Sequence, residues 1–437
     1  MSDFTTATIH LWGRTVGYLA ESDAGEVIFE YDEDFRRTGL EISPVHLPLQ
    51  VSGPQVFPEL RRIRAFEGLP GVFADSLPDA FGNKVIRRFF DERGRGGRIS
   101  PVQKLLYVGT RGAGALTYEP AEVDREGNNE ILEVRDLVKQ ARRVIEGDTT
   151  GAVKEIIRVG GTAGGARPKA LILWDRRNGT VRSGHAEPRG DERPWIIKFD
   201  GITKESGGQE NVVSDEPGPW GRIEYVYSVL ARRAGISMPD THLLREEPHA
   251  HFMVRRFDRL GSRGRQRVHM HSLAGVLHLD YADQFQIGYE DYFDTIRALG
   301  IGQTGVREAF RRMIFSVATV NYDDHLKNFA FLMDEEGRWR LSPAFDIAFA
   351  ENDHWTRQHQ MSIAGKFQDI TRADLLEVGH MFDLPGGGAD TIDEVIEAVR
   401  DFRIEAEHAG LDAERIQWLD QRLYRAMEPL LAPAVPR

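Results

Sequence analysis

The spacing of hydrophobic residues changes from alternation near the amino terminus of this chain to helical periodicity towards its carboxyl terminus. Alternating segments bounded by turn residues predict short strands in roughly the first 120 residues, at TATIHLWG, RTVGYLAE, EVIFEYDE and GALTYEP. Among them, Pro78 and Asp79 open an amphipathic helix within GVFADSLPDAFGNKVIRRFF, residues 71–90. The front of the chain is therefore predicted to be rich in β-structure.

The middle of the chain mixes helices and strands. Apolar residues at helical spacing predict one helix over 133–147 and another over 223–235. Between these helices, 169–174 and 195–199 have the composition of strands that pair across a long polar connection. A β-hairpin is expected over 241–259, with its turn at the central proline.

Helical patterns dominate the remainder of the chain, at about 289–299, 304–320, 371–381, 390–409 and 412–431. We therefore predict an α+β fold in three parts. These are a β-rich subdomain over 1–125, a mixed core over 126–256 and a mainly helical part over 257–437.

Composition narrows the class of protein. Hydrophobic residues make up 41% and charged residues 28% of the 437 residues, which is typical of a water-soluble globular protein. The sequence has neither an apolar run long enough for a membrane span nor the pattern of a signal peptide. It also contains no cysteine, which excludes disulfides and thiolate metal sites and fits a reducing cytoplasm.

The charge balance argues against broad electrostatic binding to nucleic acid, because the formal net charge is −12. One local exception is RRFFDERGRGGR, residues 87–98, which contains five arginines. We interpret it as a solvated, mobile loop in preference to a phosphate-binding patch.

The strongest chemical signal lies in VNYDDHLKNFAFLMDEEGRWRLSPAFD, residues 320–346. FAFLM, DEEG and RWRLS predict a strand, a turn and a returning strand. Asn328 precedes the outgoing strand and Asp346 follows the returning one, so the hairpin carries both side chains to the same end. An amide and a carboxylate with room left for phosphate suit Mg²⁺.

Asp323 precedes Asn328 by five residues, the separation found in the protein-kinase catalytic loop H-R-D-x-x-x-x-N. A carboxylate at the mouth of such a metal site can orient and deprotonate the attacking hydroxyl in phosphoryl transfer. In the competing interpretation, Asp323 and Asp324 cap a helix or loop and Asn328 satisfies the backbone at a strand start. We further expect Asp324 to support the loop.

Two upstream features fit the same chemistry. The segment GGTAGGARPK, residues 160–169, has enough glycine for backbone amides to approach a phosphate. It matches neither a Walker A loop nor the G-x-G-x-x-G motif. In the alternative interpretation, the segment is only a turn. Lys198 lies among apolar residues in WIIKF and needs an anionic partner if it is buried. Glu224 is the candidate partner. In the alternative interpretation, Lys198 lies on an edge strand and its side chain faces solvent.

Taken together, these residues resemble HipA-like proteins, the toxin components of bacterial HipBA modules. The segments that carry the resemblance occur in the same order as in that family: DSLPDAFGNKVIRR, GGARPKALI, WIIKFD, RRFDR, NYDDHLKNFAFL and LSPAFD. The resemblance implies a two-lobed protein-kinase-like fold with an extra amino-terminal subdomain, a β-rich amino-terminal lobe and a mainly helical carboxyl-terminal lobe. It also implies a serine/threonine protein kinase that uses ATP and Mg²⁺.

The resemblance further implies a role for individual residues. Asp323 corresponds to the catalytic aspartate, Asn328 and Asp346 to the metal ligands, and Glu224 to the ion-pair partner of the ATP-phosphate lysine, Lys198. The remaining ATP-binding residues would be those of the phosphate loop, the hinge and the catalytic loop: Gly164, Gly165, Ala166, Arg167, Lys169, Arg255, Phe257, His325 and Lys327. Family members can silence themselves by phosphorylating a serine ahead of the phosphate loop; this chain offers Thr162 there and no serine.

The family also suggests partners. The phosphorylated protein is commonly an aminoacyl-tRNA synthetase, and a HipB-like helix-turn-helix antitoxin commonly restrains the kinase and connects it to DNA. The first alternative function is a small-molecule kinase of the antibiotic-kinase type. The second is a non-catalytic corepressor subunit.

A third alternative is a metal-dependent hydrolase. The motifs HAH (249–251) and HMH (269–271) would each place two histidines on one face of a strand. The sequence supplies no third ligand at a suitable spacing.

Overall fold

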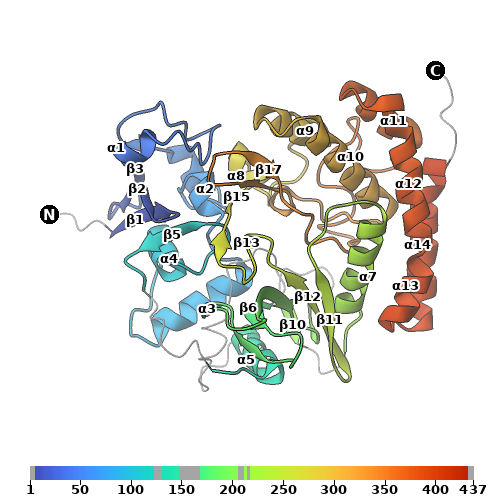
Figure 1. Cartoon of the computed structure of the whole chain (residues 1–437), viewed down its shortest axis with the longest axis horizontal. Helices are drawn as coiled ribbons and strands as arrows, with labels where there is room; N and C mark the ends of the chain where they lie inside the picture. Colours follow the sequence, from blue (N-terminus) through green and yellow to red (C-terminus); the bar gives the residue numbers. More distant parts are fainter. Residues whose placement is uncertain (1–4, 123–129, 147–167, 205–210, 214–216, 432–437) are drawn as a thin grey trace.

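The computed structural model describes residues 5–122, 130–146, 168–204, 211–213 and 217–431. Its strands gather on one side of the molecule and in the centre, and the helices of the carboxyl-terminal half gather on the other side (Figure 1). The fold is α+β and two-lobed, with an additional amino-terminal module, as the sequence predicted.

The amino-terminal module is built on a five-stranded antiparallel sheet of order β4-β3-β2-β1-β5. Its strands are β1 (Thr5–Leu11), β2 (Arg14–Glu21), β3 (Val27–Tyr31), β4 (Gln55–Val56) and β5 (Leu116–Glu119). Short helices pack around this sheet: α1 (Glu33–Arg36), η1 (Pro58–Arg62), α2 (Gly71–Ala74) and α4 (Pro101–Val108). Together they enclose one apolar core that runs from Ala7 to Tyr118.

The sequence interpretation missed helix α4, although a local signal for it exists. Ser100 and Gln103 form a reciprocal capping box, and Pro101 occupies the first helical position. The spacing S-x-x-Q before an apolar run is a recognised helix start.

Helix α3 (Ala80–Asp91) begins at the predicted place, since the Asp79 carboxylate accepts a hydrogen bond from the Gly82 amide at 2.6 Å. The expectation of a solvated loop over 87–98 is wrong for its first part. Helix α3 continues to Asp91 because Phe89 and Phe90 are buried in the core that the helix shares with the second sheet, whereas Arg87 and residues 91–98 are exposed.

The second sheet is also antiparallel and has the order β11-β12-β8-β6-β7. Its strands are β6 (Lys169–Trp174), β7 (Val181–Ser183), β8 (Arg193–Lys198), β11 (Thr241–Glu246) and β12 (His249–Arg255). Strands β9 (Ile202–Lys204) and β10 (Asn211–Val213) form a separate pair. Helices α3 and α5 (Val134–Glu146) share a core with the second sheet.

Strand β8 lies between β12 and β6, so the alternative that placed Lys198 on a solvent-facing edge strand is wrong. In this register Lys198 stands directly opposite Lys169 of β6. Both predicted lysines therefore lie at the same end of the central strands.

The helical half contains α7 (Trp220–Arg233) and the helices that follow it along the chain, which share one large core. These are α8 (Leu273–Leu277), α9 (Tyr289–Ala298), α10 (Gln303–Ala318), α11 (Arg372–Met381), α12 (Ala389–Arg400), α13 (Phe402–Ala409) and α14 (Ala413–Leu431), with the 3-10 turn η3 (Pro385–Gly388). The single helix predicted over 390–409 is two helices, because the chain turns at Asp401.

The predicted hairpin is present as β16 (Ala330–Met333) and β17 (Trp339–Leu341). A third strand, β15 (His269–Ser272), pairs with β16, and a small ribbon of β13 (Arg259–Leu260) and β14 (Gln266–Arg267) precedes it. The three proposed domain ranges remain a prediction.

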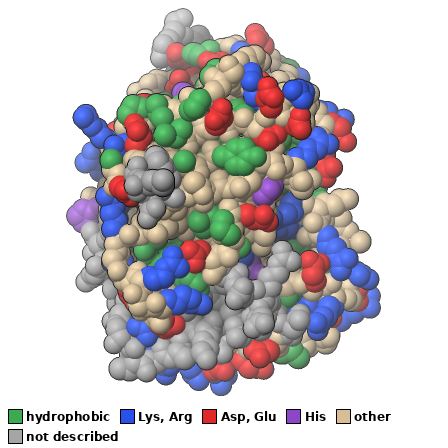
Figure 2. Space-filling view, turned by 90° about the vertical axis from the view of Figure 1, so that its left-hand side faces the viewer, with side chains coloured by type: hydrophobic (Ala, Val, Ile, Leu, Met, Phe, Trp, Pro, Cys, Tyr) green, Lys and Arg blue, Asp and Glu red, His purple; other side chains and the backbone are tan. Residues whose placement is uncertain are grey.

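Among the described helices, none combines the length and the apolar character needed to cross a membrane. Viewed from the side of the amino-terminal module, basic and acidic side chains are interspersed over the surface, with small groups of apolar side chains between them (Figure 2). The exposed large apolar residues of the module are Tyr18, Val45, Val51 and Val56.

Candidate active site

The β16–β17 hairpin sets the position of the predicted metal ligands. Phe331 pairs with Leu341, and the Ser342 amide donates to the Ala330 carbonyl at 2.9 Å, so the chain returns past its own starting point. Asn328, in the short turn η2 (Leu326–Asn328), precedes this pairing and Asp346 follows it. Asp346 adopts a positive φ of 56°, a conformation that aspartate and asparagine tolerate better than most residues.

Lys198 joins the two lobes at this point. Its ammonium donates to Glu224 Oε1 of helix α7 at 2.5 Å and also contacts Asp346 Oδ1. Burial alone would lower the pKa of Lys198, but Asp346 and Glu224 together raise it above its ordinary value. Burial would likewise raise the pKa of Asp346, yet Lys198 and Lys169 hold it well below its usual range. Three predicted residues from three distant segments thus form one charged cluster.

The loop from Asp323 to Asn328 lies beside this cluster. The Asn328 side-chain amide donates to the Asp323 carbonyl at 2.7 Å, which fixes the spacing of the loop internally. His325 Nε2 lies 4.0 Å from Asp323 Oδ1, and the same imidazole helps to lower the pKa of Asp346. The loop and Asp346 are therefore close enough for their charges to interact.

These side chains fit a magnesium ion that is bound together with phosphate. The Asn328 amide uses its nitrogen for the loop, which leaves its oxygen without a hydrogen-bond partner among the described residues. Within the described part of the chain, no three acidic, histidine or cysteine side chains gather into a complete metal cage. Mg²⁺ commonly takes only one or two protein oxygens and completes its shell with phosphate and water.

Asp324 has a different environment from its neighbour. It is buried, and its carboxylate accepts hydrogen bonds from the Tyr289 hydroxyl at 2.9 Å, His359 Nδ1 at 2.7 Å and the Gln360 amide at 2.7 Å. The expectation that Asp324 supports the loop is confirmed, because three donors from two other segments hold it in place.

Lys169 pairs with a carboxylate from the amino-terminal part of the chain. Its ammonium is buried 3.4 Å from Asp79, at the start of helix α3. Burial lowers the pKa of Lys169 and raises the pKa of Asp79, so each group is held less firmly in its charged form than in water. The remainder of the predicted phosphate loop, Gly164, Gly165, Ala166 and Arg167, lies outside the described residues, as does Thr162.

The side chains of the two predicted hinge residues, Arg255 and Phe257, have different surroundings. Phe257 lies against Phe345, with ring centroids 5.4 Å apart, and so borders the residue that precedes Asp346. The Arg255 side chain instead turns to the surface, where it donates to Asp240 at 3.1 Å. The Arg255 backbone ends strand β12, two residues before Phe257.

Comparisons with known proteins identify the family of this chain. The HipA-like C-terminal domain matches residues 161–404, more than half of the chain, and the HipA N-terminal domain matches residues 7–119. The chain belongs to the HipA-like family. A curated relative from Sinorhizobium fredii, named "Putative kinase Y4dM", is 22% identical over 364 residues, which cover 79% of this chain and 78% of that protein.

Among solved structures, HipA from the Shewanella oneidensis MR-1 toxin–antitoxin complex of HipA, HipB and operator DNA matches with a TM-score of 0.68. The match covers 97% of both chains at 16% identity, and at that identity it establishes the fold alone. The amino-terminal module and both lobes of this chain therefore follow the HipA arrangement.

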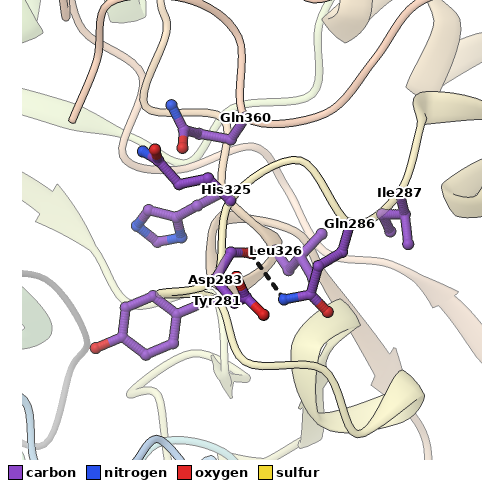
Figure 3. A pocket seen from close by; sticks show the side chains of 8 residues that line it. Tyr281, Asp283, Gln286, Ile287, His325, Leu326 and Gln360 are labelled. Atoms are coloured by element: carbon purple, nitrogen blue, oxygen red, sulfur yellow. Dashed lines mark hydrogen bonds between the residues drawn. The ribbon is translucent and has the colours of Figure 1, made fainter. Parts of the chain in front are cut away.

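A small pocket lies beside the loop of residues 323–328. His325 and Leu326 line one side, while Tyr281 and Ile287 come from the loop ahead of helix α9 (Figure 3). In the loop ahead of helix α9, the Gln286 side chain donates a hydrogen bond to the Asp283 carbonyl at 2.8 Å. Lys327, a predicted ATP contact, lies over the Tyr281 ring, with its ammonium 5.1 Å from the ring centroid.

The sequence interpretation of this HipA-like protein missed two residues at the site. Trp355 donates its indole N–H to Asp323 Oδ1 at 3.0 Å, across 32 positions of sequence. Asp79 was identified only as a helix start, although it also faces Lys169. No periodicity signals the first contact, whereas the paired acids of DSLPD are a local signal for the second.

The other acid of DSLPD anchors the module to the helical half. Asp75 accepts hydrogen bonds from His271 Nδ1 at 2.7 Å, the Ser272 amide at 2.7 Å and the Ser272 hydroxyl at 2.6 Å. Nearby, His46 stacks on His278 with ring centroids 3.8 Å apart. We call the contact of Ile42, Ser43, His46 and Asp75 with His269, His271, Ser272 and His278 the module interface.

The histidine motifs considered for a hydrolase have structural partners. In HMH, His269 Nε2 lies 2.8 Å from the Ile42 carbonyl, and both ring nitrogens of His271 are engaged by Asp75 and Ser43. In HAH, His251 Nδ1 accepts from the Asp200 amide at 2.9 Å. These contacts assign the buried histidines to packing between segments.

Proposed function

We propose that this HipA-like protein is an ATP-dependent serine/threonine protein kinase. The observation that carries the proposal is the contact of Lys198 with Glu224 and Asp346, because it joins a central strand, a helix of the helical half and the residue after the β16–β17 hairpin. A lysine that can hold nucleotide phosphates, a glutamate that orients it and an aspartate that binds metal are the parts that protein kinases need together.

The other predicted residues take roles around that centre. Asn328 and Asp346 would hold Mg²⁺, which neutralises charge on the phosphates when it is bound. Lys198 and Lys169 would face the ATP phosphates, together with Gly164, Gly165, Ala166 and Arg167. Phe257, the backbone of Arg255, His325 and Lys327 would line the rest of the nucleotide site.

Asp323 would accept the hydrogen bond of the target hydroxyl. Its side chain is 35% exposed, unlike that of buried Asp324, so an incoming hydroxyl can reach it. As the hydroxyl oxygen bonds to the γ-phosphorus and the bond to ADP breaks, the hydroxyl proton passes to Asp323. Thr162 is a candidate acceptor within the chain itself.

We further propose a HipB-like helix-turn-helix antitoxin as partner. The Shewanella complex contains HipA, HipB and operator DNA, and the two chains match over 97% of their length. Contact with DNA would be mainly indirect, through the antitoxin, which agrees with the net charge of −12. A cytoplasmic protein target, such as an aminoacyl-tRNA synthetase, is consistent with a bacterial toxin of this family.

The test is phosphate transfer from γ-labelled ATP with Mg²⁺ to a bacterial lysate and, in parallel, to a panel of small alcohols. We expect labelled protein with the wild type and at least a 100-fold loss with Asp323→Asn. Asp383→Asn is the matched control, because it makes the same substitution at an exposed carboxylate that pairs with Arg297.

Label on a small alcohol alone would favour a small-molecule kinase. Full activity of Asp323→Asn would refute the assignment of the base. A wild type that binds ATP without transferring phosphate to either set of acceptors would support a corepressor without catalysis.

A further inference from the structure

Trp355 makes a polar contact with Asp323 from outside the catalytic loop. Its indole N–H donates to Oδ1 at 3.0 Å, and His325 Nε2 lies 4.0 Å from the same oxygen. The second oxygen of Asp323, Oδ2, has no hydrogen-bond partner among the described residues. The carboxylate is thus held from one side and open on the other.

An indole is well suited to this position. Its N–H donates one hydrogen bond and cannot accept a proton, so it does not compete for the proton of a substrate hydroxyl. A donor on Oδ1 fixes the rotation of the carboxylate plane and leaves Oδ2 available as an acceptor. A lysine or histidine in the same place would add a charge or a second titrating group.

Hydrogen bonds to the backbone of Trp355 fix the position of this residue. The Trp355 carbonyl accepts from the side-chain amides of Gln284 at 2.7 Å and Gln360 at 2.9 Å. Gln360 in turn donates its backbone amide to Asp324 at 2.7 Å. The fully buried Asp324 is therefore connected through Gln360 and Trp355 back to its exposed neighbour, Asp323.

Hydrogen bonds within the turn of residues 352–356, which carries the indole, also fix its conformation. The Asn352 side chain accepts from the amides of His354 at 2.8 Å and Thr356 at 3.1 Å, and the Asn352 amide donates to the Thr356 carbonyl at 3.1 Å. Thr356 is buried, so the turn is anchored at its far end. Such supporting contacts are what a preorganised site requires.

We infer that Trp355 is a positioning residue for Asp323: its indole N–H holds one carboxylate oxygen so that the other faces the hydroxyl to be phosphorylated. This inference rests on the proposed kinase function. It assigns to the turn of residues 352–356 the task of setting the orientation of the base. In the opposite arrangement, the indole would restrain Asp323 in an unproductive orientation, and its removal would accelerate the reaction.

The test compares two tryptophan-to-phenylalanine variants of the full chain. Trp355→Phe keeps an aromatic ring and removes the N–H. Trp12→Phe is the matched control, because the Trp12 indole donates to the Arg267 carbonyl at 2.7 Å and does not contact the site. ADP release is measured with ATP, Mg²⁺ and casein as a generic hydroxyl acceptor, with Asp323→Asn alongside.

We expect Trp355→Phe to lower kcat about tenfold with the KM for ATP within twofold of wild type, since one hydrogen bond to a charged group is lost. Trp12→Phe should keep the wild-type kcat. Gln284→Leu provides a second variant that leaves Trp355 and Asp323 intact, and it should lower kcat in the same direction by a smaller factor.

The inference is overturned if Asp323→Asn is inactive while Trp355→Phe and Gln284→Leu keep or exceed the wild-type kcat. An equal loss in Trp12→Phe would also overturn it, because the effect would then be general to the fold. If Asp323→Asn is as active as wild type, the proposed function fails first, and the two failures are thereby distinguished.

Discussion

The module interface and the charged cluster around Lys198 are both polar and largely buried, yet they are built differently. At the module interface, the Asp75 carboxylate receives three donors, and His269 and His271 each contact a neighbouring segment. In the charged cluster, Lys198 is shared between two carboxylates. Most polar atoms of the interface are paired within the protein, although His269 Nδ1 is buried without a hydrogen-bond partner among the described residues. The loop beside the cluster instead keeps acceptor oxygens without such partners, which a substrate can use.

This difference indicates where the protein gains stability and where it gains activity. A satisfied buried network holds two parts of a chain in one arrangement. Charges that are held close together but remain partly unsaturated are typical of a site that exchanges partners. Substitutions in the two regions should therefore separate loss of activity from loss of stability.

The largest effect is expected in the charged cluster. Asp346→Asn should lower ADP release about 10³-fold, because it removes the proposed metal carboxylate and one partner of Lys198. Asparagine tolerates the positive φ, and Lys198 keeps Glu224, so the free energy of unfolding should change by at most about 1 kcal/mol. Urea denaturation measures the free energy of unfolding. If the loss of stability were as large as the loss of activity, both expressed as free energies, the distinction between the two regions would be contradicted.

The next effect belongs to the module interface. Asp75→Ala should lower the free energy of unfolding by about 3–5 kcal/mol, because three donors lose their acceptor in a buried place. The molecules that remain folded should keep kcat within about tenfold of wild type. Asp75→Asn, which retains an acceptor oxygen, should be milder, and an inactive Asp75→Ala with wild-type stability would contradict the assignment.

The smallest effect expected from any one residue is the pH dependence of stability that each of two buried histidines contributes. Burial lowers the pKa of His269 to about 4 and that of His278 to about 3, whereas unfolded histidine titrates near 6.5. Below pH 6.5 the unfolded chain takes up protons that the folded chain excludes, so stability falls as the pH drops towards 4.

For His269 this loss amounts to roughly 3 kcal/mol by pH 4, since each pKa unit corresponds to about 1.4 kcal/mol. Urea denaturation from pH 7 to 4 measures the slope. His269→Gln should be less stable at pH 7 but should show a flatter dependence; an unchanged slope would show that this histidine does not carry it.

Local patterns predicted the elements well wherever one short segment decided the outcome. The strands around Ile9, the helix after Asp79 and the hairpin between Asn328 and Asp346 all follow from alternation, capping or turn residues close in sequence. The loop assigned to 87–98 failed because burial of Phe89 and Phe90 against another sheet outweighed the local run of charge.

The sequence predicted only part of the candidate site. Spacing suggested Asp323 with Asn328, and the need of a buried lysine for an anion suggested Lys198 with Glu224. The contact of Trp355 with Asp323 joins segments whose separation in sequence carries no period, and pattern analysis has no means of detecting it. For the contact of Asp79 with Lys169, the paired acids of DSLPD gave a local signal, but nothing in the sequence named the lysine as the partner.

The sequence by itself determined the kinds of element, the hairpin that returns Asp346 towards Asn328 and the family to which the chain belongs. These depend on residues that are near one another along the chain or on motifs kept in order. Only the tertiary structure decided that Lys198 lies on a central strand, that Asp324 is buried while Asp323 remains open, and that an indole holds the open one. Burial and long-range hydrogen bonding are properties of the packed chain, and they gave two adjacent aspartates different environments.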